Sequence, residues 1–358
     1  MRWYGRIMDI VFWGISALRM YRIPPFLRGD LAARFDREHL LHRPSRVDQS
    51  AVDLIGRPVH VMVRSRADRW SLKHAKMHLW GGDIPVGAIE ECGPYASCAT
   101  PAFALLQLAP FVSQIHLCML LHEVCGGFTV CELPGCVRDE LQVLVGRGWH
   151  GSEGWRPVLD SAGRLTDLWQ RPACIDVDSV ARFAACNQGA RGGLRLLRAT
   201  QDYFGCARSP FEVRAALQYG LSRLRGGEGR VVRLDERIDL SRSGRILTGQ
   251  SVCYADLLAE SLDGSRQLVL ECQSRLIHSA ADRQLLDFDR QAALQAMGYE
   301  YIPLTYAQLR DDARHREMAE LVGMKLEGRY LEKSALLMER ERALRRELFC
   351  DWRRLGEV

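Results

Sequence analysis

SVCYADLL (251–258), QLVLECQ (267–273) and YIPLT (301–305) are the three segments that decide the fold of the C-terminal half of this chain. Each is short, apolar and bounded by turn-forming or polar residues, so each is predicted to be a strand. ADRQLLDFDRQAALQAM (281–297) has apolar residues at helical spacing and is followed by Gly298, which predicts a helix. A further strand is expected at Asp235–Leu240, and a helix before it runs from Pro210 to Leu224.

Two acidic residues fall on neighbouring predicted strands. Asp256 lies in the first quoted segment and Glu271 in the second, with His278 shortly after it. Carboxylate oxygens suit Mg²⁺, so Asp256 and Glu271 are candidate metal ligands for phosphodiester hydrolysis, with His278 acting on the attacking water. The alternative is that both acids lie at exposed strand ends and that His278 is a surface residue. Glu271 favours the site, because it follows three apolar residues and a buried lone carboxylate is costly.

Further candidates surround this pair. Gln273 shares a strand face with Glu271, because residues i and i+2 point the same way. Glu212 can join the site, but Ser209-Pro210-Phe211-Glu212 also fits a helix-capping box, which we prefer. Asp287 and Arg290 are three residues apart on the predicted helix. They form either a surface ion pair or, through Arg290, a phosphate contact.

The order helix–strand–strand–strand–helix–strand, with these acids, resembles the restriction-endonuclease-like fold. Within it, the chain is most similar to the very-short-patch-repair endonuclease branch and its uncharacterised relatives. That branch pairs an Asp on one strand with Glu-x-Asp on the next, a nearby His, and D-x-x-R-x-x-x-L-x-x-x-G on the following helix. The last spacing is matched by Asp287, Arg290, Leu294 and Gly298. The resemblance implies a Mg²⁺-dependent endonuclease acting on DNA.

One position departs from that pattern, because the third site residue is Gln273 where the family has Asp or Lys. An amide can hydrogen-bond water or phosphate, but it cannot act as a base. The N-terminal half, through Ser16-Ala17-Leu18 and Pro101-x-x-x-x-Leu106-Gln107-Leu108-Ala109, resembles uncharacterised actinobacterial proteins. Those proteins combine such a C-terminal domain with a region similar to type IV abortive-infection antitoxin regulators. This implies a non-catalytic DNA- or partner-binding regulator, paired with a toxin or another protein, as the alternative function.

Composition indicates a folded protein of about two domains. The 358 residues are 47% hydrophobic and 26% charged, with a net charge of +5, and only four of the cations are lysines. Arginine grips phosphate through two N–H groups, but a G+C-rich genome gives the same bias without functional meaning. Arg195 and Arg198 share a predicted helix face with Arg191, which suits either a phosphate backbone or plain solvent exposure.

Cysteine usage and hydropathy bear on location. The twelve cysteines form no C-x-x-C pair or zinc module, so we expect buried free thiols in a reducing cytoplasm. No apolar run reaches the length of a membrane span, since polar residues interrupt the best candidate, Pro101–Leu121. Ile10–Leu18 loosely imitates a signal peptide, but no cleavage site follows it. We expect a strand leading into a helix there.

The expected fold class is therefore α/β. An N-terminal mixed α+β domain (1–165) precedes a helical connector (166–205), the endonuclease-like αβββαβ core (206–310) and C-terminal helices (311–358). Leu337, Met338, Leu344 and Leu348 give the last helices an apolar side that can pack on the chain itself or form a homodimer.

Overall fold

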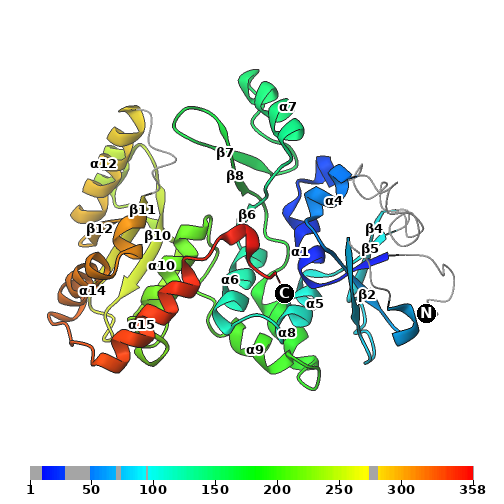
Figure 1. The fold of residues 1–358 in the computed structure, drawn as a ribbon. Coiled ribbons are helices and arrows are strands. Elements are labelled where there is room, and N and C mark those ends of the chain that lie inside the picture. The colour runs from blue at the N-terminus through cyan, green and yellow to red at the C-terminus, as the bar shows by residue number, and fades with distance from the viewer. Residues whose placement is uncertain (1–9, 29–48, 70–73, 94–95, 274–280, 358) are drawn as a thin grey trace.

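The computed structural model describes residues 10–28, 49–69, 74–93, 96–273 and 281–357. Within these ranges the chain is a mixed α/β protein with three sheets (Figure 1). No helix in this part of the chain is long and apolar enough to cross a membrane.

The N-terminal sheet has five strands in the order β3-β2-β1-β5-β4. Its strands are β1 (Ile10–Phe12), β2 (Val59–Val63), β3 (Ala75–Leu79), β4 (Ile89–Gly93) and β5 (Ala96–Ala99), accompanied by α1 (Gly14–Arg22), α4 (Gln49–Ile55) and the short 3₁₀ helix η2 (Arg66–Asp68). The strand leading into a helix that was predicted after residue 10 is confirmed as β1 and α1.

A layer of helices forms the middle of the molecule. It comprises α5 (Pro101–Leu108), α6 (Gln114–Cys125), α8 (Val177–Cys186) and α9 (Gly193–Thr200). Every residue of α5 is buried, and α6 is buried from Leu117 to Cys125. Both helices of the expected connector, 166–205, pack in the core, because Val180 of α8 and Leu196 of α9 are fully buried in the main hydrophobic cluster.

A small antiparallel sheet in the order β6-β8-β7 stands above this layer (Figure 1). It consists of β6 (Phe128–Val130), β7 (Arg156–Leu159) and β8 (Leu165–Gln170), with α7 (Gly135–Gly146) between β6 and β7. The boundary expected at residue 165 falls on the first residue of β8, inside the β7–β8 hairpin. The chain does not separate at that point, because β8 pairs on both sides.

The C-terminal sheet has four strands in the order β12-β11-β10-β9. They are β9 (Val231–Asp239), β10 (Val252–Glu260), β11 (Gln267–Gln273) and β12 (Glu300–Thr305). Only β11 and β12 are parallel, and α12 (Ala281–Ala296) joins them. With α10 (Pro210–Gly220) and the short η3 (Arg223–Arg225) ahead of β9, the predicted order is observed, with an additional short helix, α11 (Arg242–Thr248).

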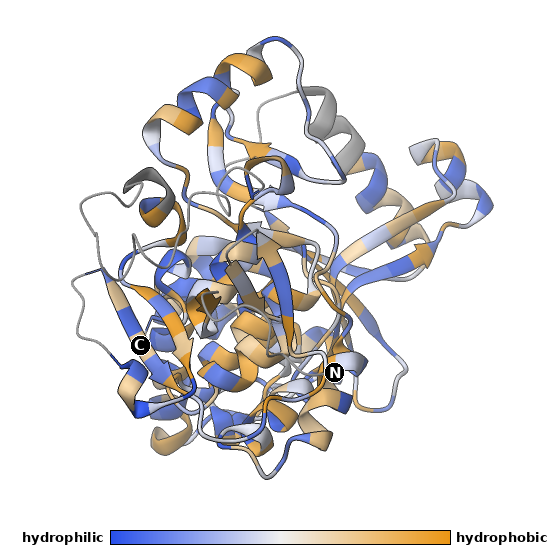
Figure 2. Cartoon of the chain, turned by 90° about the vertical axis from the view of Figure 1, so that its right-hand side faces the viewer, coloured by the Kyte–Doolittle hydropathy of each residue, from blue (hydrophilic) through white to orange (hydrophobic). Residues whose placement is uncertain are grey.

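Different helices cover the two faces of this sheet. Leu268 and Leu270 of β11 belong to the main hydrophobic cluster, together with Leu217 of α10. Val269 belongs to a second cluster with Leu294 of α12. Because successive strand residues point to opposite faces, α10 and α12 lie on opposite sides of the sheet. In Figure 2 most helices carry both hydrophobic and hydrophilic residues, as expected for helices with one buried face.

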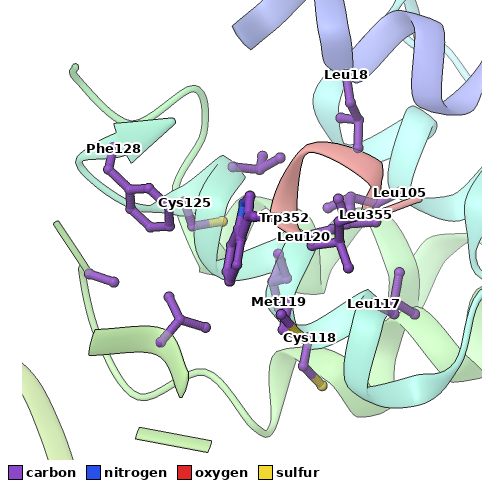
Figure 3. Packing of buried hydrophobic residues seen from close by; sticks show 14 of the residues in the cluster. Leu18, Leu105, Leu117, Cys118, Met119, Leu120, Cys125, Phe128, Trp352 and Leu355 are labelled. Carbon is purple, nitrogen blue, oxygen red and sulfur yellow. The ribbon is translucent and has the colours of Figure 1, made fainter. Parts of the chain in front are cut away.

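The C-terminal segment runs back to the middle of the molecule. It contains α13 (Tyr306–Arg310), α14 (Asp312–Glu327), α15 (Ala335–Leu348) and the short η4 (Trp352–Arg354). Trp352 and Leu355 are buried beside Leu120 and Phe128, which come from α6 and β6 (Figure 3). Leu344 and Leu348 of α15 are also buried. The apolar residues at these positions therefore pack on the chain itself.

A buried carboxylate holds this arrangement. Glu123 of α6 accepts two bonds from Arg22 of α1, at 2.9 and 2.7 Å, one from Thr129 of β6 at 2.7 Å, and one from the indole N–H of Trp352 at 2.9 Å. Burial alone raises the pKa of a carboxyl, but Arg22 and these donors hold the pKa of Glu123 below its ordinary value. Glu123 therefore remains ionised inside the core.

Glu123→Gln is expected to lower the free energy of unfolding by about 3–5 kcal/mol, because it leaves the Arg22 charge buried without its partner. Urea unfolding at neutral pH measures this. Glu320→Gln, on the exposed side of α14, is the matched control and should change stability little. A similar small change in both variants would contradict the central role of Glu123.

Candidate functional site

The predicted acids lie where two central strands part. β10 stays paired with β9 down to Val252, and β11 stays paired with β12 up to Gln273. The pairing between β10 and β11, however, runs only from Glu260 and Gln267 to Leu257 and Leu270. We call the opening beyond that point the fork, with Tyr254–Asp256 on one arm and Glu271–Gln273 on the other.

Asp256 and Glu271 come together at the base of the fork. The Cys272 N–H donates to Asp256 Oδ2 at 2.9 Å, so a carboxylate oxygen accepts the bond that a backbone carbonyl would accept in a regular strand pair. Asp256 and Glu271 are the next residues after the last β10–β11 pair, Leu257 and Leu270, and both line the same cleft. Burial raises the pKa of Asp256 above its ordinary value, although the Cys272 N–H and the charge of Arg290 oppose that rise. Two acids from adjacent strands thus meet in a poorly solvated place.

Arg290 closes the fork from α12. Its guanidinium donates to both oxygens of Glu271, at 2.9 and 3.2 Å, and also to the carbonyl of Tyr254. One side chain therefore bridges the two arms. In this structure the Arg290 guanidinium pairs with Glu271. Its contact with a phosphate stays a prediction. Asp287 is on the same helix, but its side chain lies outside the described residues.

Glu212 takes part in the cap of α10, and its carboxylate also lines the cleft. The Ser209 side chain accepts from the Glu212 N–H at 3.3 Å, and the Glu212 carboxylate accepts from the Ser209 hydroxyl and the Arg208 N–H, both at 2.7 Å. Ser209 therefore caps α10, as predicted, with Pro210 first in the helix. The same carboxylate faces the fork: burial and then the charge of Asp256 raise the pKa of Glu212 to about 8.

Asp235 is a site residue that the sequence analysis missed. It has a φ of 50°, in the left-handed region. Leu234 packs in the main cluster and Ile238 in the second. Residues four apart in a regular strand would share a face, so the strand reverses its faces around this position. Asp tolerates left-handed backbone better than most residues, which was the available signal.

The Asp235 carboxylate is paired rather than free. It accepts two bonds from Arg208, at 2.9 and 3.0 Å, and its charge acts on both Asp256 and Glu212. Among the side chains that the structure describes, four acids therefore lie around the fork, contributed by α10, β9, β10 and β11. Only Asp235 and Glu271 among them carry a guanidinium partner in the described part of the chain.

The fork opens into a cleft of about 1260 Å³. Gln273, Tyr301 and Tyr306 line it beside the acids, and the β8 strand of the small sheet forms the opposite wall. Gln273 thus lies where the sequence predicts. His278 lies outside the described residues.

Arg195 and Arg198 are not part of this cleft. They lie on α9, where Arg195 donates to the carbonyl of Val112 at 2.6 Å and Arg198 is exposed. Arg195 therefore has a hydrogen-bond partner within the chain. Nucleic-acid binding by Arg195 and Arg198 stays a prediction.

A second cluster of charges was also missed. Glu228, His315 and Glu341 are the one group of three possible metal ligands within 4.8 Å of one another in the described ranges. Lys333 donates to both carboxylates at 2.5 Å, and His315 contacts Glu228 at 3.2 Å. An ammonium group therefore already holds the position between the acids. We read this cluster as the attachment of α14 and α15 to the loop before β9.

All twelve cysteines are free. Five are buried, two are exposed and the others are half-buried, so the expectation that most are buried holds only in part. Cys118 and His122 are buried. Both ring nitrogens of His122 have hydrogen-bond partners, the Cys118 carbonyl and the Phe204 N–H.

No family model, curated protein or solved structure matches this chain. The interpretation of the fork therefore depends on its own geometry and chemistry.

Glu212 should make stability depend on pH. A carboxyl whose folded-state pKa is raised contributes stability that is full below its unfolded pKa and is lost as pH rises through its folded pKa, here from about 4.5 to about 8. Urea unfolding at pH 5, 7 and 9 should show a loss in the native chain that Glu212→Gln largely removes. The single amide oxygen of Gln can still accept the Arg208 N–H bond, and its NH₂ group can donate to the Ser209 hydroxyl. Equal losses in both proteins would show that Glu212 ionises normally.

Proposed function

We propose that this chain is a divalent-cation-dependent phosphodiesterase acting on DNA, through a restriction-endonuclease-like C-terminal domain. The observation that carries the proposal is the convergence of Asp256 and Glu271 at the fork, directly beyond the last β10–β11 pair and in the lining of one cleft. Two acids brought together on parting strands repel each other unless a proton or a cation lies between them. Their position at the floor of a large cleft, with Gln273 beside them, suits a substrate-binding role.

The donor set fits a hard cation such as Mg²⁺. Asp256 and Glu271 would hold it, with Glu212 near enough for the charge of Asp256 to raise its pKa. These donors are carboxylate oxygens, which Mg²⁺ prefers. Burial first, and neighbouring acids second, raise the pKa of Asp256 and Glu212, so a bound cation would favour the ionised form of both. When bound, the ion would neutralise phosphate charge and lower the pKa of a water molecule.

The residues of the chain supply positioning more than proton transfer. The Gln273 amide can donate to a phosphate oxygen or accept from water, but it cannot remove a proton. Tyr254 and Asp256 are held by Arg290 and Cys272, so the arms of the fork are fixed before a substrate arrives. Such preorganisation reduces the cost of reaching a reactive geometry.

The charges along the cleft support a dependence of DNA binding on a bound cation. Acidic residues outnumber arginines along its walls, six to four. The two sets are Glu132, Asp167, Glu212, Asp256, Glu271 and Asp351, and Arg138, Arg208, Arg214 and Arg353. A polyanion entering such a cleft meets net repulsion when all six acids are ionised, and a bound cation would reduce that repulsion.

A second candidate is a non-catalytic regulator that binds DNA, a toxin or another protein through the same fold. Two observations favour it: Gln273 stands at the third site position, and Arg290 already neutralises Glu271. A cytoplasmic location belongs to both proposals and is supported by the twelve free thiols. Leu344 and Leu348 are buried within the chain, so these two residues are not available to form a homodimer through the C-terminal helices.

Nicking of supercoiled plasmid DNA tests the enzymatic proposal. The native chain should nick DNA with Mg²⁺ or Mn²⁺ and not with a chelator. Loss of a residue that merely supports a metal ligand costs about 10–100-fold, so Asp256→Asn and Glu271→Gln should each lose more than that. Glu320→Gln, on the exposed side of α14, is the control.

If the native chain and both acid variants nick DNA equally slowly, the hydrolase proposal is wrong. Filter binding then decides the second candidate. DNA retained without any divalent cation, with affinity that falls steeply with salt, supports a regulator, whereas indifference to DNA removes both.

A further inference from the structure

Arg290 occupies the place at the fork where a cation would be expected. Its guanidinium grips both oxygens of Glu271 and reaches the Tyr254 carbonyl on the other arm. The Glu271 oxygens are the same atoms that the proposed function assigns to a metal ion. A bidentate pair is the strongest geometry available to Arg and carboxylate, so a divalent cation must compete with it.

The pair is neither fully buried nor fully satisfied. The Arg290 side chain keeps 25% of its exposure and Glu271 keeps 16%. Arg290 Nε is buried and has no hydrogen-bond partner within the described residues. An unpaired N–H beside two paired ones is an incomplete arrangement, because a buried donor without an acceptor costs free energy. A phosphate can pair in a bidentate way with the Nε–H and one Nη–H along a single edge of the guanidinium, which would give the Nε–H an acceptor.

We propose that Arg290 is an exchangeable counter-ion: it neutralises Glu271 in the free protein, and it transfers to a phosphate of the nucleic acid when a divalent cation takes Glu271. This inference rests on the proposed metal site. It makes cation binding and DNA binding mutually favourable, because each ligand releases a partner that the other needs. Arg290 is thus a positioning residue that keeps the cation from binding tightly before the substrate is present.

The geometry explains why this role falls to Arg290 and not to the other cations near the fork. Arg208 lines the cleft, but it pairs with Asp235 and its cation faces the Tyr254 ring at 5.8 Å. Arg214 is buried and donates to the carbonyls of Leu348 and Cys350. Within the described ranges, Arg290 is the cation that the structure pairs with an assigned metal ligand.

Calorimetric titration of Mn²⁺ in the absence of DNA tests the exchange. Arg290→Met removes the competitor and keeps a long apolar side chain, so it should bind Mn²⁺ more tightly than the native chain. Coupling between two sites is typically about 5–150-fold, and we expect a gain in that range. Arg208→Met is the matched control, because it also removes one positive charge from the cleft but frees Asp235, not Glu271.

The native chain supplies the second half of the test. Here Ca²⁺ is titrated in place of Mn²⁺, to slow hydrolysis, with and without a short DNA duplex. The duplex should raise the Ca²⁺ affinity of the native chain, and it should have a much smaller effect on the Ca²⁺ affinity of Arg290→Met. Equal Mn²⁺ affinity in the native chain, Arg290→Met and Arg208→Met would overturn the exchange while leaving the metal site intact. Failure of all three to bind Mn²⁺, with or without the duplex, would overturn the metal site itself. Thermal unfolding of each variant verifies that it is folded.

Discussion

The ionised carboxylate of Glu123 joins parts of the chain that are far apart in sequence. Its partners are Arg22, 101 residues before it, and Trp352, 229 residues after it. A buried charge of this kind tolerates few alternatives, because losing one partner leaves another polar group unpaired in the core. The N-terminal sheet, the central helices and the C-terminal segment are therefore tied at one point, and the main hydrophobic cluster passes through all three.

This tie also positions one wall of the candidate site. Arg214 of α10 donates to the carbonyls of Leu348 and Cys350 and lies 5.3 Å from the Trp352 ring. The first turn of the same helix carries Glu212, which faces the fork. A tail that is anchored at Glu123 thus fixes α10 from its outer side, and α10 in turn fixes one of the acids. Stability of the core and geometry of the cleft are coupled through a single helix.

At the fork itself, the balance of charge decides which chemistry is open. Burial raises the pKa of Asp256 and Glu212, while Arg290 neutralises Glu271. In the free protein Arg208 and Arg290 therefore neutralise Asp235 and Glu271, and burial disfavours the ionised forms of Asp256 and Glu212. A divalent cation at the fork would favour those ionised forms and compete with Arg290 for Glu271. The Gln273 amide adds a hydrogen-bonding group but no charge, so any hydrolysis depends on the cation more than on a side-chain base.

The sequence by itself determined the α/β class, the order of strands and helices in the C-terminal half, the Ser209 cap and the contribution of Asp256 and Glu271 to neighbouring strands. These features follow from apolar periodicity and local hydrogen bonds, which act within a few residues. Only the tertiary structure decided that β10 and β11 part at those acids, that left-handed Asp235 reverses a strand, and that Arg290 pairs with Glu271. It also decided that Lys333 fills the cluster of Glu228, His315 and Glu341. Such contacts join segments up to about a hundred residues apart, and their register depends on packing that no local pattern specifies.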